Sequence, residues 1–326
     1  MSNVDPRTER HTLAEIARLY YLKDASKVDI GRRFGLSRFK VARLLDQARE
    51  QGVVSISIQG VAPVDVLASH RLSEHWGINV TVVNSSEGTE PEVRRFVGQA
   101  TAELFMDNIH EGDIVGLSWG RTLRSMTDFL TRLPKLSVVQ LIGAVTSDLE
   151  ESPVELVRRT SLSTGGKAYP IIAPAIFVDA GALAMLKTNP DVKAALDLFD
   201  HLDIAIISVG SWNPPASQVR AVLGEPDRDR LDELGVRAEV AGVFFDADGN
   251  TVAEDFSCRY LAISAAQLRR VPRLVAAAGG RIKLDAVRSV VKSGIITDLV
   301  TDHTLAEAGL QLGPIEPAAN PDRPLP

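Results

Sequence analysis

Residues 29–52 read DIGRRFGLSRFKVARLLDQAREQG, and this stretch decides the fold of the first part of the chain. Its apolar residues recur at helical spacing on both sides of Gly35-Leu36, and a similar pattern predicts an earlier helix over residues 12–23. The Ser37 hydroxyl can accept a free amide hydrogen of the helix that follows, and Gly52 is a natural end for that helix. Two helices joined by a short glycine-containing turn are typical of a helix-turn-helix unit.

The helix predicted after Ser37 has two different faces. One face is apolar and should pack in a core, whereas the other is basic and presents an aromatic ring. A base edge or a thymine methyl in the major groove of DNA would explain an exposed ring there. The alternative is that Phe39 packs against another part of the chain. The apolar face carries Val41, Leu44, Leu45 and Ala48, and the predicted DNA-binding residues are Ser37, Arg38, Phe39, Lys40, Arg43 and Gln47.

The charges are divided unevenly along the chain. The 326 residues carry a net charge of −6. Residues 1–59 hold eleven Lys and Arg against seven Asp and Glu, a net charge of +4, so the remainder is −10. A basic head on an acidic body suggests a nucleic-acid-binding unit joined to one with another role. A solvated helix face that happens to be basic would give the same count.

Three parts can be separated along the chain. After Gly52, residues 53–59 (VVSISIQ) alternate with period two and predict a strand that closes the head as part of a small wing. Gly60 and Pro63 mark a boundary, so we predict a helix-turn-helix domain over residues 1–60 and an effector-binding domain over 61–313. Residues 314–326 contain five prolines, and we expect this tail to be disordered and dispensable.

The body alternates short apolar runs with longer helical patterns. This order predicts an α/β domain with a doubly wound, largely parallel sheet, and the nearly all-apolar strands suit a sheet that helices cover on both faces. Ligands of such sheets bind where loops follow the carboxyl ends of the strands. The predicted strands are 79–83, 113–118, 138–142, 203–210, 274–280 and 297–302, and the main helices are 90–110, 121–132, 153–162, 190–199 and 283–292.

The strongest ligand-binding candidate follows the strand in DIVGLSWGRTLRSM. Two small hydroxyl residues, a glycine and an arginine stand where a helix begins, which suits an anion. Gly120 would let the backbone approach the ligand closely. An ordinary strand-to-helix turn with a serine cap is the alternative. The predicted phosphate-binding residues are Ser118, Gly120, Arg121 and Thr122.

Other polar groups follow further strands. Asp246 could accept hydrogen bonds from sugar hydroxyls, and Lys283 could pair with a phosphate or a hydroxyl. Turn chemistry and simple solvation are the alternatives for these two. Thr164 and Lys167 lie in a glycine-containing stretch that we expect to be a basic loop. The remaining effector-binding candidates are Gln140, Gly143, Gly210, Asp246 and Lys283.

Several classes of protein are excluded by composition. One cysteine, Cys258, cannot build a disulfide scaffold and fits a reducing cytosol. The six histidines are scattered without metal-ligand spacing, so no metal and no cofactor is predicted. No apolar run approaches a membrane span and the first residues show no signal peptide, so we expect a cytoplasmic protein.

The chain resembles the SorC family of bacterial transcriptional regulators over roughly residues 10–312. The resemblance rests on DIGRRFGLSRFKVARLLDQAREQGVVSISI in the head. In the body it rests on GLSWGRTL, VVQLIGAV, YPIIAPAIFVD, DIAIISVGSW, GVFFDADGNTV and AAAGGRIKLDAVRSVVKSGIITDLVTDHTLA. It implies a winged-type helix-turn-helix head, a body similar to sugar-phosphate isomerases, phosphorylated sugars as effectors, and dimers or tetramers on operator DNA. It also implies that Gln140, Asp246 and Lys283 contact the sugar.

This chain departs from the family pattern at a few positions. Gly31 stands where the family usually has alanine, which predicts a less stable helix by about 1 kcal/mol. Ser208 stands where a glycine is common, and Arg237 and Ala238 where smaller residues or glycine are usual.

Three functions follow from these observations. The leading one is a DNA-binding transcriptional regulator of carbohydrate metabolism, not an enzyme, whose operator affinity is set by a small phosphorylated sugar or polyol. The second is a sugar-phosphate isomerase or deaminase with a DNA-binding head, in which Asp246 and Lys283 form an acid/base pair. The third is an RNA-binding regulator, which the lack of aromatic stacking motifs disfavours.

Overall fold

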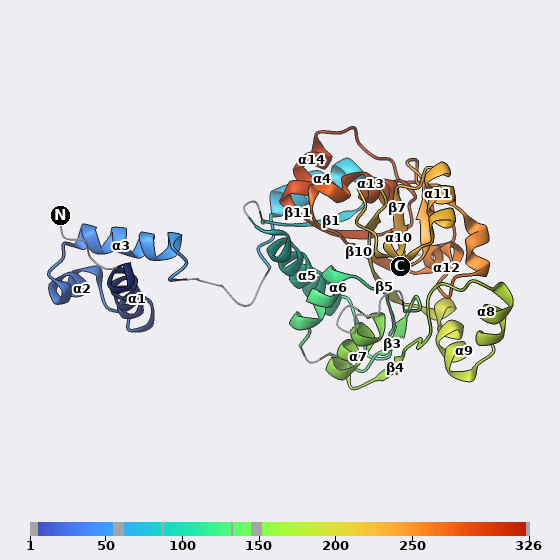
Figure 1. The fold of residues 1–326 in the computed structure, drawn as a ribbon, viewed down its shortest axis with the longest axis horizontal. Coiled ribbons are helices and arrows are strands. Elements are labelled where there is room, and N and C mark those ends of the chain that lie inside the picture. The colour runs from blue at the N-terminus through green and yellow to red at the C-terminus, as the bar shows by residue number, and fades with distance from the viewer. Residues whose placement is uncertain (1–5, 55–61, 86–87, 132, 145–151, 324–326) are drawn as a thin grey trace. The chain divides into compact units, whose positions relative to one another are not determined.

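The computed structural model describes residues 6–54, 62–85, 88–131, 133–144 and 152–323 (Figure 1). The chain divides into two compact units, Met1–Gly60 and Val61–Pro326. We call them the head and the body and describe each by itself.

The head is a bundle of three helices around a small apolar core. Ser26 and Ser37 cap the second and third helices, and the Ser37 hydroxyl accepts the amide hydrogen of Lys40 at 3.2 Å, as the sequence predicts. The first helix begins earlier than predicted, at Pro6 instead of residue 12. Residues 55–59 of the predicted strand lie outside the described residues. The helices are α1 (Pro6–Leu22), α2 (Lys27–Phe34) and α3 (Arg38–Glu50), and their core is Leu13, Ile16, Ala17, Ile30, Val41, Leu45 and Ala48.

A glycine inside α2 lets the turn of the helix-turn-helix unit close tightly. A Cβ atom on Gly31 would stand 2.5 Å from the carbonyl oxygen of Leu36. The Leu36 amide donates to the Gly31 carbonyl at 2.8 Å, and Gly35 adopts the left-handed conformation that glycine favours. The alanine usual at this position would therefore clash with the Leu36 carbonyl in this chain. This tight packing explains why position 31 is a glycine.

The body is built on one seven-stranded sheet in which every neighbouring pair of strands is parallel. The strand order is β1-β11-β10-β5-β2-β3-β4. The chain runs outward from β2 to β4, then returns to β5 and runs outward the other way to β11, so the order reverses between β2 and β5. The strands are β1 (Asn79–Val83), β2 (Ile114–Leu117), β3 (Ser137–Gln140), β4 (Lys167–Tyr169), β5 (Ile204–Ser208), β10 (Arg273–Ala277) and β11 (Asp298–Asp302).

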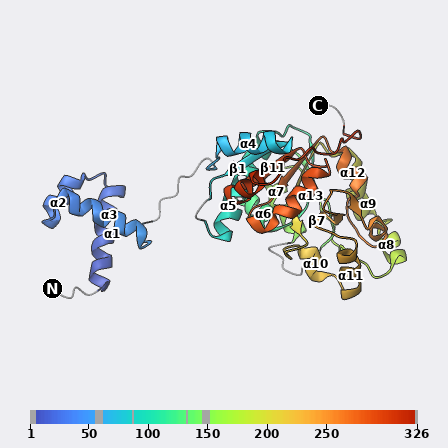
Figure 2. The same cartoon turned by 90° about the horizontal axis from the view of Figure 1, so that it is seen from above.

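Alternate residues of the strands enter two separate cores, one on each face of the sheet. In β5, Ile204 and Ile206 pack with α5, α6 and α7, whereas Ala205 and Ile207 pack on the other face. Figure 2 shows α4 and α5 on opposite sides of the β1 edge. The sheet is therefore doubly wound, as predicted. The covering helices include α4 (Val66–Trp76), α5 (Glu90–Met106), α6 (Arg121–Met126), α7 (Pro153–Thr164), α8 (Ala180–Leu186), α9 (Pro190–Leu196), α12 (Ala265–Arg270), α13 (Leu284–Lys292) and α14 (His303–Leu310).

A small antiparallel sheet, which the sequence analysis did not predict, extends the body after β5. Its order is β6-β7-β8-β9, and an aromatic cluster around Trp212 and Phe244 packs against it. The elements are β6 (Gly210–Ser211), α10 (Gln218–Val222), α11 (Glu225–Glu233), β7 (Ala238–Val240), β8 (Val243–Phe245) and β9 (Thr251–Val252). Short 3-10 helices complete the body: η1 (Thr127–Phe129), η2 (Asp197–His201), η3 (Glu254–Cys258) and η4 (Arg281–Lys283).

The proline-rich tail differs from its predicted disorder. Residues 314–323 run across the body, where Ile315 is buried in the main core. The Ile315 amide donates to the His75 carbonyl at 2.9 Å, and the Ala318 amide donates to the Lys292 carbonyl at 2.9 Å. The Asn320 side chain donates to the Arg269 carbonyl at 3.0 Å. Proline fixes an extended backbone at little entropic cost, so a proline-rich segment can also serve as an ordered strap.

Candidate functional site

A cavity of about 490 Å³ lies at the carboxyl edge of the parallel sheet. The loops that follow β1, β2, β5, β10 and β11 line it, and these five strands are neighbours in the sheet. The cavity lies beside the point between β2 and β5 where the strand order reverses, and doubly wound sheets bind ligands at such points. Its volume suits a small molecule. Of the predicted effector-binding residues, the cavity is lined by Gly120, Arg121, Thr122, Gly210 and Lys283.

Two serines fix the loop after β2. The buried Ser118 hydroxyl accepts the amide hydrogen of Ser208 at 3.1 Å, and the Ser208 hydroxyl donates to the Trp119 carbonyl. Gly120 has φ 133° and ψ 156°, which only glycine adopts readily, and a Cβ atom there would stand 2.6 Å from the Ser208 hydroxyl oxygen. Ser118 therefore does not line the cavity but holds the loop that does, and Ser208 makes glycine necessary at position 120.

Three cationic side chains face the cavity from different elements. Arg94 comes from α5, Arg121 from the start of α6, and Lys283 from η4. The Lys283 ammonium donates to the Val209 carbonyl at 2.8 Å. Burial, together with the nearby positive charge of Arg121, lowers the pKa of Lys283 to about 8. Because α6 has only six residues, attraction for an anion here rests on these side chains more than on a helix dipole.

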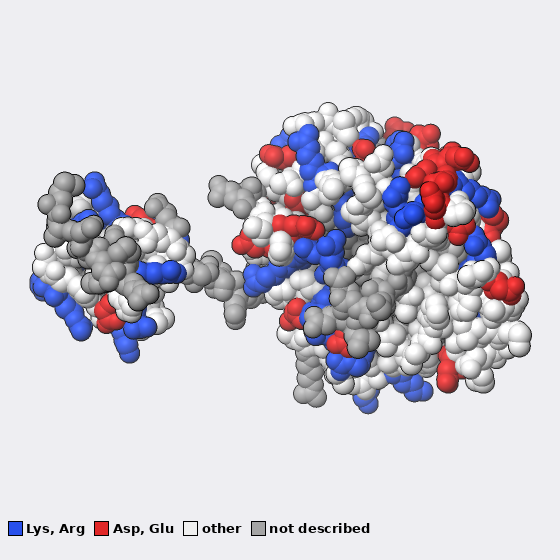
Figure 3. All heavy atoms as spheres, viewed as in Figure 1, with Lys and Arg blue, Asp and Glu red and all other residues white. Residues whose placement is uncertain are grey.

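Two carboxylates balance part of this charge. Glu90 lies 3.5 Å from Arg94 and 3.8 Å from Arg121, measured between its Oε1 and the guanidinium nitrogens, and it is largely exposed. Figure 3 shows basic side chains gathered over α5 and α6 with acidic side chains beside them. The exposed pairs contribute little to stability, so their guanidinium groups can be shared with a ligand at low cost.

Glu239, the second carboxylate, is a cavity residue that the sequence analysis missed. Its side chain is 4% exposed; Oε1 accepts the Gly242 amide hydrogen at 2.7 Å and Oε2 accepts the Ser217 hydroxyl at 3.2 Å. Burial raises the pKa of Glu239 to about 7, against the lowering effects of these hydrogen bonds and of Lys283. A Cβ atom on Gly210 would stand 2.7 Å from Oε2, so Gly210 makes room for this carboxyl.

A sequence signal for Glu239 existed. It is the one charged residue between Ala238 and Phe245, a segment of otherwise apolar residues and glycine. A lone carboxyl in a buried strand either has hydrogen-bonding partners or serves a site.

Residues 64–311 match the Sugar-bind family, described as "Putative sugar-binding domain", over more than half of the chain. The chain belongs to the Sugar-bind family. The sorbitol operon regulator of Klebsiella pneumoniae is 29% identical over 310 residues, which cover 90% of this chain and 96% of that protein. The erythritol catabolism regulatory protein EryD of Brucella abortus (strain 2308) is 28% identical over 295 residues, 89% of this chain and 93% of that protein.

A solved structure agrees with these relatives over both units of the chain. The crystal structure of the full-length sorbitol operon regulator SorC from Klebsiella pneumoniae has a TM-score of 0.70 at 26% identity, covering 93% of this chain and 99% of that one. This Sugar-bind protein is therefore a SorC-type transcriptional regulator and not an enzyme.

Besides Ser118, three more of the predicted effector-binding residues do not line the cavity of this SorC-type regulator. The buried Gln140 side chain donates to the carbonyls of Ile142 and Ile171 and accepts the Ile171 amide hydrogen, so its hydrogen-bonding groups tie two chain segments together. Gly143 lies against the backbone of Pro174, which a Cβ atom would approach to 2.7 Å. Both residues are structural.

Asp246 is the third of these residues outside the cavity. Its carboxylate accepts the amide hydrogens of Asp248 and Asn250 at 2.9 Å and the Asn250 side-chain amide at 3.0 Å. Hydrogen bonds from Asn250, Asp248 and Gly249 hold the pKa of Asp246 low, although burial opposes them. Asp246 therefore stabilises the turn and does not pair with Lys283, whose carboxyl neighbours in the cavity are Glu239 and Glu90.

The predicted basic loop at Thr164 and Lys167 is also absent. Thr164 ends α7, and its hydroxyl accepts the Gly166 amide hydrogen at 2.9 Å. Lys167 begins β4, opposite Ser137 at the start of β3, which is the amino edge of the sheet. It therefore lies at the edge away from the cavity.

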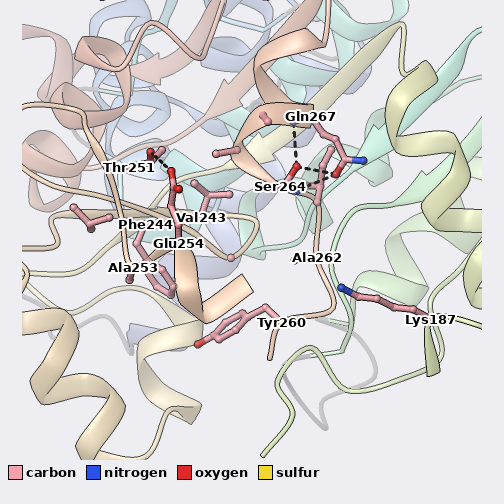
Figure 4. A pocket seen from close by; sticks show the side chains of 15 residues that line it. Lys187, Val243, Phe244, Thr251, Ala253, Glu254, Tyr260, Ala262, Ser264 and Gln267 are labelled. Carbon is pink, nitrogen blue, oxygen red and sulfur yellow. Dashed lines mark hydrogen bonds between the residues drawn. The ribbon is translucent and has the colours of Figure 1, made fainter. Parts of the chain in front are cut away.

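A second cavity of about 370 Å³ lies between β8, β9 and α12 (Figure 4). Four of its polar side chains pair with one another: Ser264 with Gln267, and Thr251 with Glu254 at 3.0 Å. It contains none of the predicted effector-binding residues. The cavity at the carboxyl edge is therefore the better candidate for the Sugar-bind ligand.

The described residues limit two other kinds of site. Among them, no helix is long and apolar enough to cross a membrane. Within the same ranges, no group of three or more His, Cys, Asp and Glu side chains could hold a metal ion.

The predicted DNA-binding surface on α3 is largely exposed. Phe39 is 81% exposed, and Arg38, Lys40 and Arg43 are exposed beside it, whereas Gln47 is half-buried. On the opposite side, Val41, Leu45 and Ala48 are buried as expected.

Asp46, which would repel DNA phosphates if it were unpaired, forms an ion pair with Arg49. Its charge is therefore partly neutralised within α3.

Proposed function

We propose that this SorC-type regulator binds operator DNA through α3 and that a small phosphorylated sugar or polyol in the carboxyl-edge cavity controls this binding. The single observation that supports the ligand is the cavity itself, where Arg94, Arg121 and Lys283 face one space together with Glu239. We infer that the protein works in the cytoplasm as a homodimer or homotetramer, because operator binding by two symmetric heads would match a two-fold DNA site.

The charges of the cavity favour an anion that also carries hydroxyl groups. Three cations face two carboxyls, and one of these, Glu239, is partly protonated near neutral pH because burial raises its pKa to about 7. The net charge is thus positive, which suits a phosphate. Glu239 can donate or accept hydrogen bonds, as recognition of a sugar hydroxyl requires.

The contribution of the head follows from its exposed surface. Arg38, Lys40 and Arg43 can contact phosphates or base edges, and Phe39 can pack on a thymine methyl. An aromatic ring that is 81% exposed on a small protein has no packing reason within the head.

A binding panel tests the ligand. Sorbitol and erythritol, which are named by two relatives, are each tested with and without a phosphate group by thermal shift and calorimetry. A bound ligand at about 100 times its dissociation constant stabilises the folded state by about 2.7 kcal/mol. Binding restricted to phosphorylated compounds, abolished in Arg121→Ala, supports the proposal. If only the free polyols bind, the ligand is a polyol without a phosphate group and that part of the proposal is wrong.

A second experiment tests the head. Operator fragments are isolated from genomic DNA with the purified protein, and their affinities are measured for wild type, Arg43→Ala and Arg71→Ala. We expect Arg43→Ala to weaken operator binding by about 1–3 kcal/mol while leaving the body's ligand affinity unchanged. The control, Arg71, lies on α4 of the body. Unchanged operator affinity in both variants would refute the assignment of α3.

A further inference from the structure

A buried carboxylate behind the cavity connects two of the cavity's polar groups. Asp302 ends β11, is fully buried and does not line the cavity. Its Oδ1 accepts the Gly280 amide hydrogen at 2.6 Å, and its Oδ2 accepts the amide hydrogen of Thr304 at 3.1 Å and the Thr304 hydroxyl hydrogen. Gly280 and Thr304 both line the cavity.

Through Gly280, Asp302 is connected to the cavity residue Lys283 by a second hydrogen bond. The Gly280 carbonyl accepts the Lys283 amide hydrogen at 3.0 Å, and the Lys283 ammonium then reaches the Val209 carbonyl. Gly279 is held just before this turn, because a Cβ atom there would stand 2.8 Å from Val93 of α5 and 3.5 Å from Asp302. The loop that carries Lys283 is therefore fixed between α5 and the Asp302 carboxylate.

The bond to Thr304 decides what that hydroxyl can offer to a ligand. A threonine hydroxyl has one hydrogen and two lone pairs. Because its hydrogen is directed to Asp302, only the oxygen lone pairs of Thr304 remain for the cavity. An acceptor repels a fully ionised phosphate, whose oxygens are also acceptors, and attracts a hydroxyl group that donates.

We propose that Asp302 is a positioning residue that makes Thr304 an acceptor for a ligand hydroxyl and holds the Lys283 loop in place. This proposal rests on the proposed function, since it names the hydroxyl end of the same ligand. The cavity then offers two kinds of contact: the Thr304 oxygen for a ligand hydroxyl, and the arginines for the phosphate. A simple helix cap for α14 is the competing explanation, because Asp302 is the N-cap of that helix.

Asp302→Asn separates the two explanations. Asparagine is also a good N-cap, so the helix should be kept. Its amide group, however, has a single acceptor oxygen. With that oxygen on Thr304, as capping requires, the amide nitrogen faces the Gly280 amide hydrogen and releases the loop that carries Lys283. Asp179→Asn is the matched control, because Asp179 caps α8 through the same kind of bond, 2.7 Å to the Ala182 amide, and does not line the cavity.

The experiment measures binding of sorbitol 6-phosphate and inorganic phosphate by calorimetry. We expect Asp302→Asn and Thr304→Val to weaken sorbitol 6-phosphate by about fivefold to tenfold, the worth of one hydrogen bond, and to change inorganic phosphate by less than about twofold. Thr304→Ser, which keeps the hydroxyl, should restore wild-type binding. Equal effects of Asp302→Asn and Asp179→Asn, or unchanged binding by Thr304→Val, would overturn the proposal.

If the wild-type protein binds neither probe, the proposal of a phosphorylated ligand is refuted. The role of Asp302 can still be tested by a measurement that needs no ligand. Lysines are reductively methylated with a carbon-13 label, and the Lys283 signal is identified by its loss in Lys283→Arg. We expect this signal to move in Asp302→Asn and to stay in place in Asp179→Asn. If it stays in place in both variants, Asp302 does not position the lysine.

Discussion

Replacing Glu239 by glutamine should stabilise the body above neutral pH and change little in acid. The Glu239 carboxyl is buried, and burial raises its pKa from 4.5 to about 7. Glutamine keeps an oxygen for the Gly242 amide but carries no charge to be desolvated. The pKa difference of about 2.5 units, at 1.36 kcal/mol per unit, corresponds to about 3 kcal/mol.

The sign follows from proton linkage. Between pH 4.5 and 7 the folded wild type binds a proton that the unfolded chain has released, so its free energy of unfolding falls as the pH rises through this window. The loss is complete above the folded pKa. The Gln variant has no such proton, so the two proteins should be similar near pH 4 and should differ by up to about 3 kcal/mol at pH 8.

Thermal unfolding followed by circular dichroism from pH 4.5 to pH 8.5 measures the difference. For a domain of this size, about 3 kcal/mol corresponds to a Tm increase of about 6–12 °C at pH 8. Glu90→Gln is the matched control, because that carboxylate lines the same cavity but is largely exposed, so its charge carries little desolvation cost. A Tm difference between Glu239→Gln and wild type that does not change with pH would refute the buried, proton-binding carboxyl.

Three further outcomes are expected. Sulfate, whose charge is constant over this range, should bind more weakly as pH rises from 6.5 to 9 in calorimetry, because Lys283 loses its proton near pH 8 and Glu239 gains charge near pH 7. Gly120→Ala should cost about 1–3 kcal/mol and lower Tm, and Ser208→Gly should relieve only the steric part. Removing residues 314–326 should lower Tm by at least about 4 °C in thermal melts, because it exposes the core around Ile315; an unchanged Tm would favour the predicted dispensable tail.

Features that depend on neighbours in sequence could be predicted, because short-range chemistry determines them. The Ser37 cap of α3 and the apolar face through Val41 follow from helical spacing. The parallel sheet also follows, because runs such as 204–207 are apolar throughout and alternate residues enter cores on both faces. The cavity loops after β2, β5 and β10 were found because strand ends are where such sheets bind ligands.

Features that depend on distant contacts could not be predicted. Asp246 follows an apolar run like a site residue, but β8 is antiparallel and belongs to the small sheet, so its end does not lie at the carboxyl edge of the large one. The same small sheet brings Glu239 to the cavity, although Glu239 lies 119 residues after Gly120 in the sequence. The tail was misjudged because its composition resembles that of a linker, whereas the carbonyls that accept its amide hydrogens, those of His75 and Lys292, belong to α4 and α13.

The groups that line the cavity share a property that folding alone does not explain. Glu239 and Lys283 are held against the cost of burial, as their shifted pKa values of about 7 and about 8 show, and Gly120 adopts a conformation reserved for glycine. Each of these costs stability, and all three occur at one place, beside the strand-order reversal. An apolar residue at 239 or 283 would fold more easily, so the presence of Glu239 and Lys283 is best explained by a ligand whose negative charge and hydroxyl groups offset the cost of burying them.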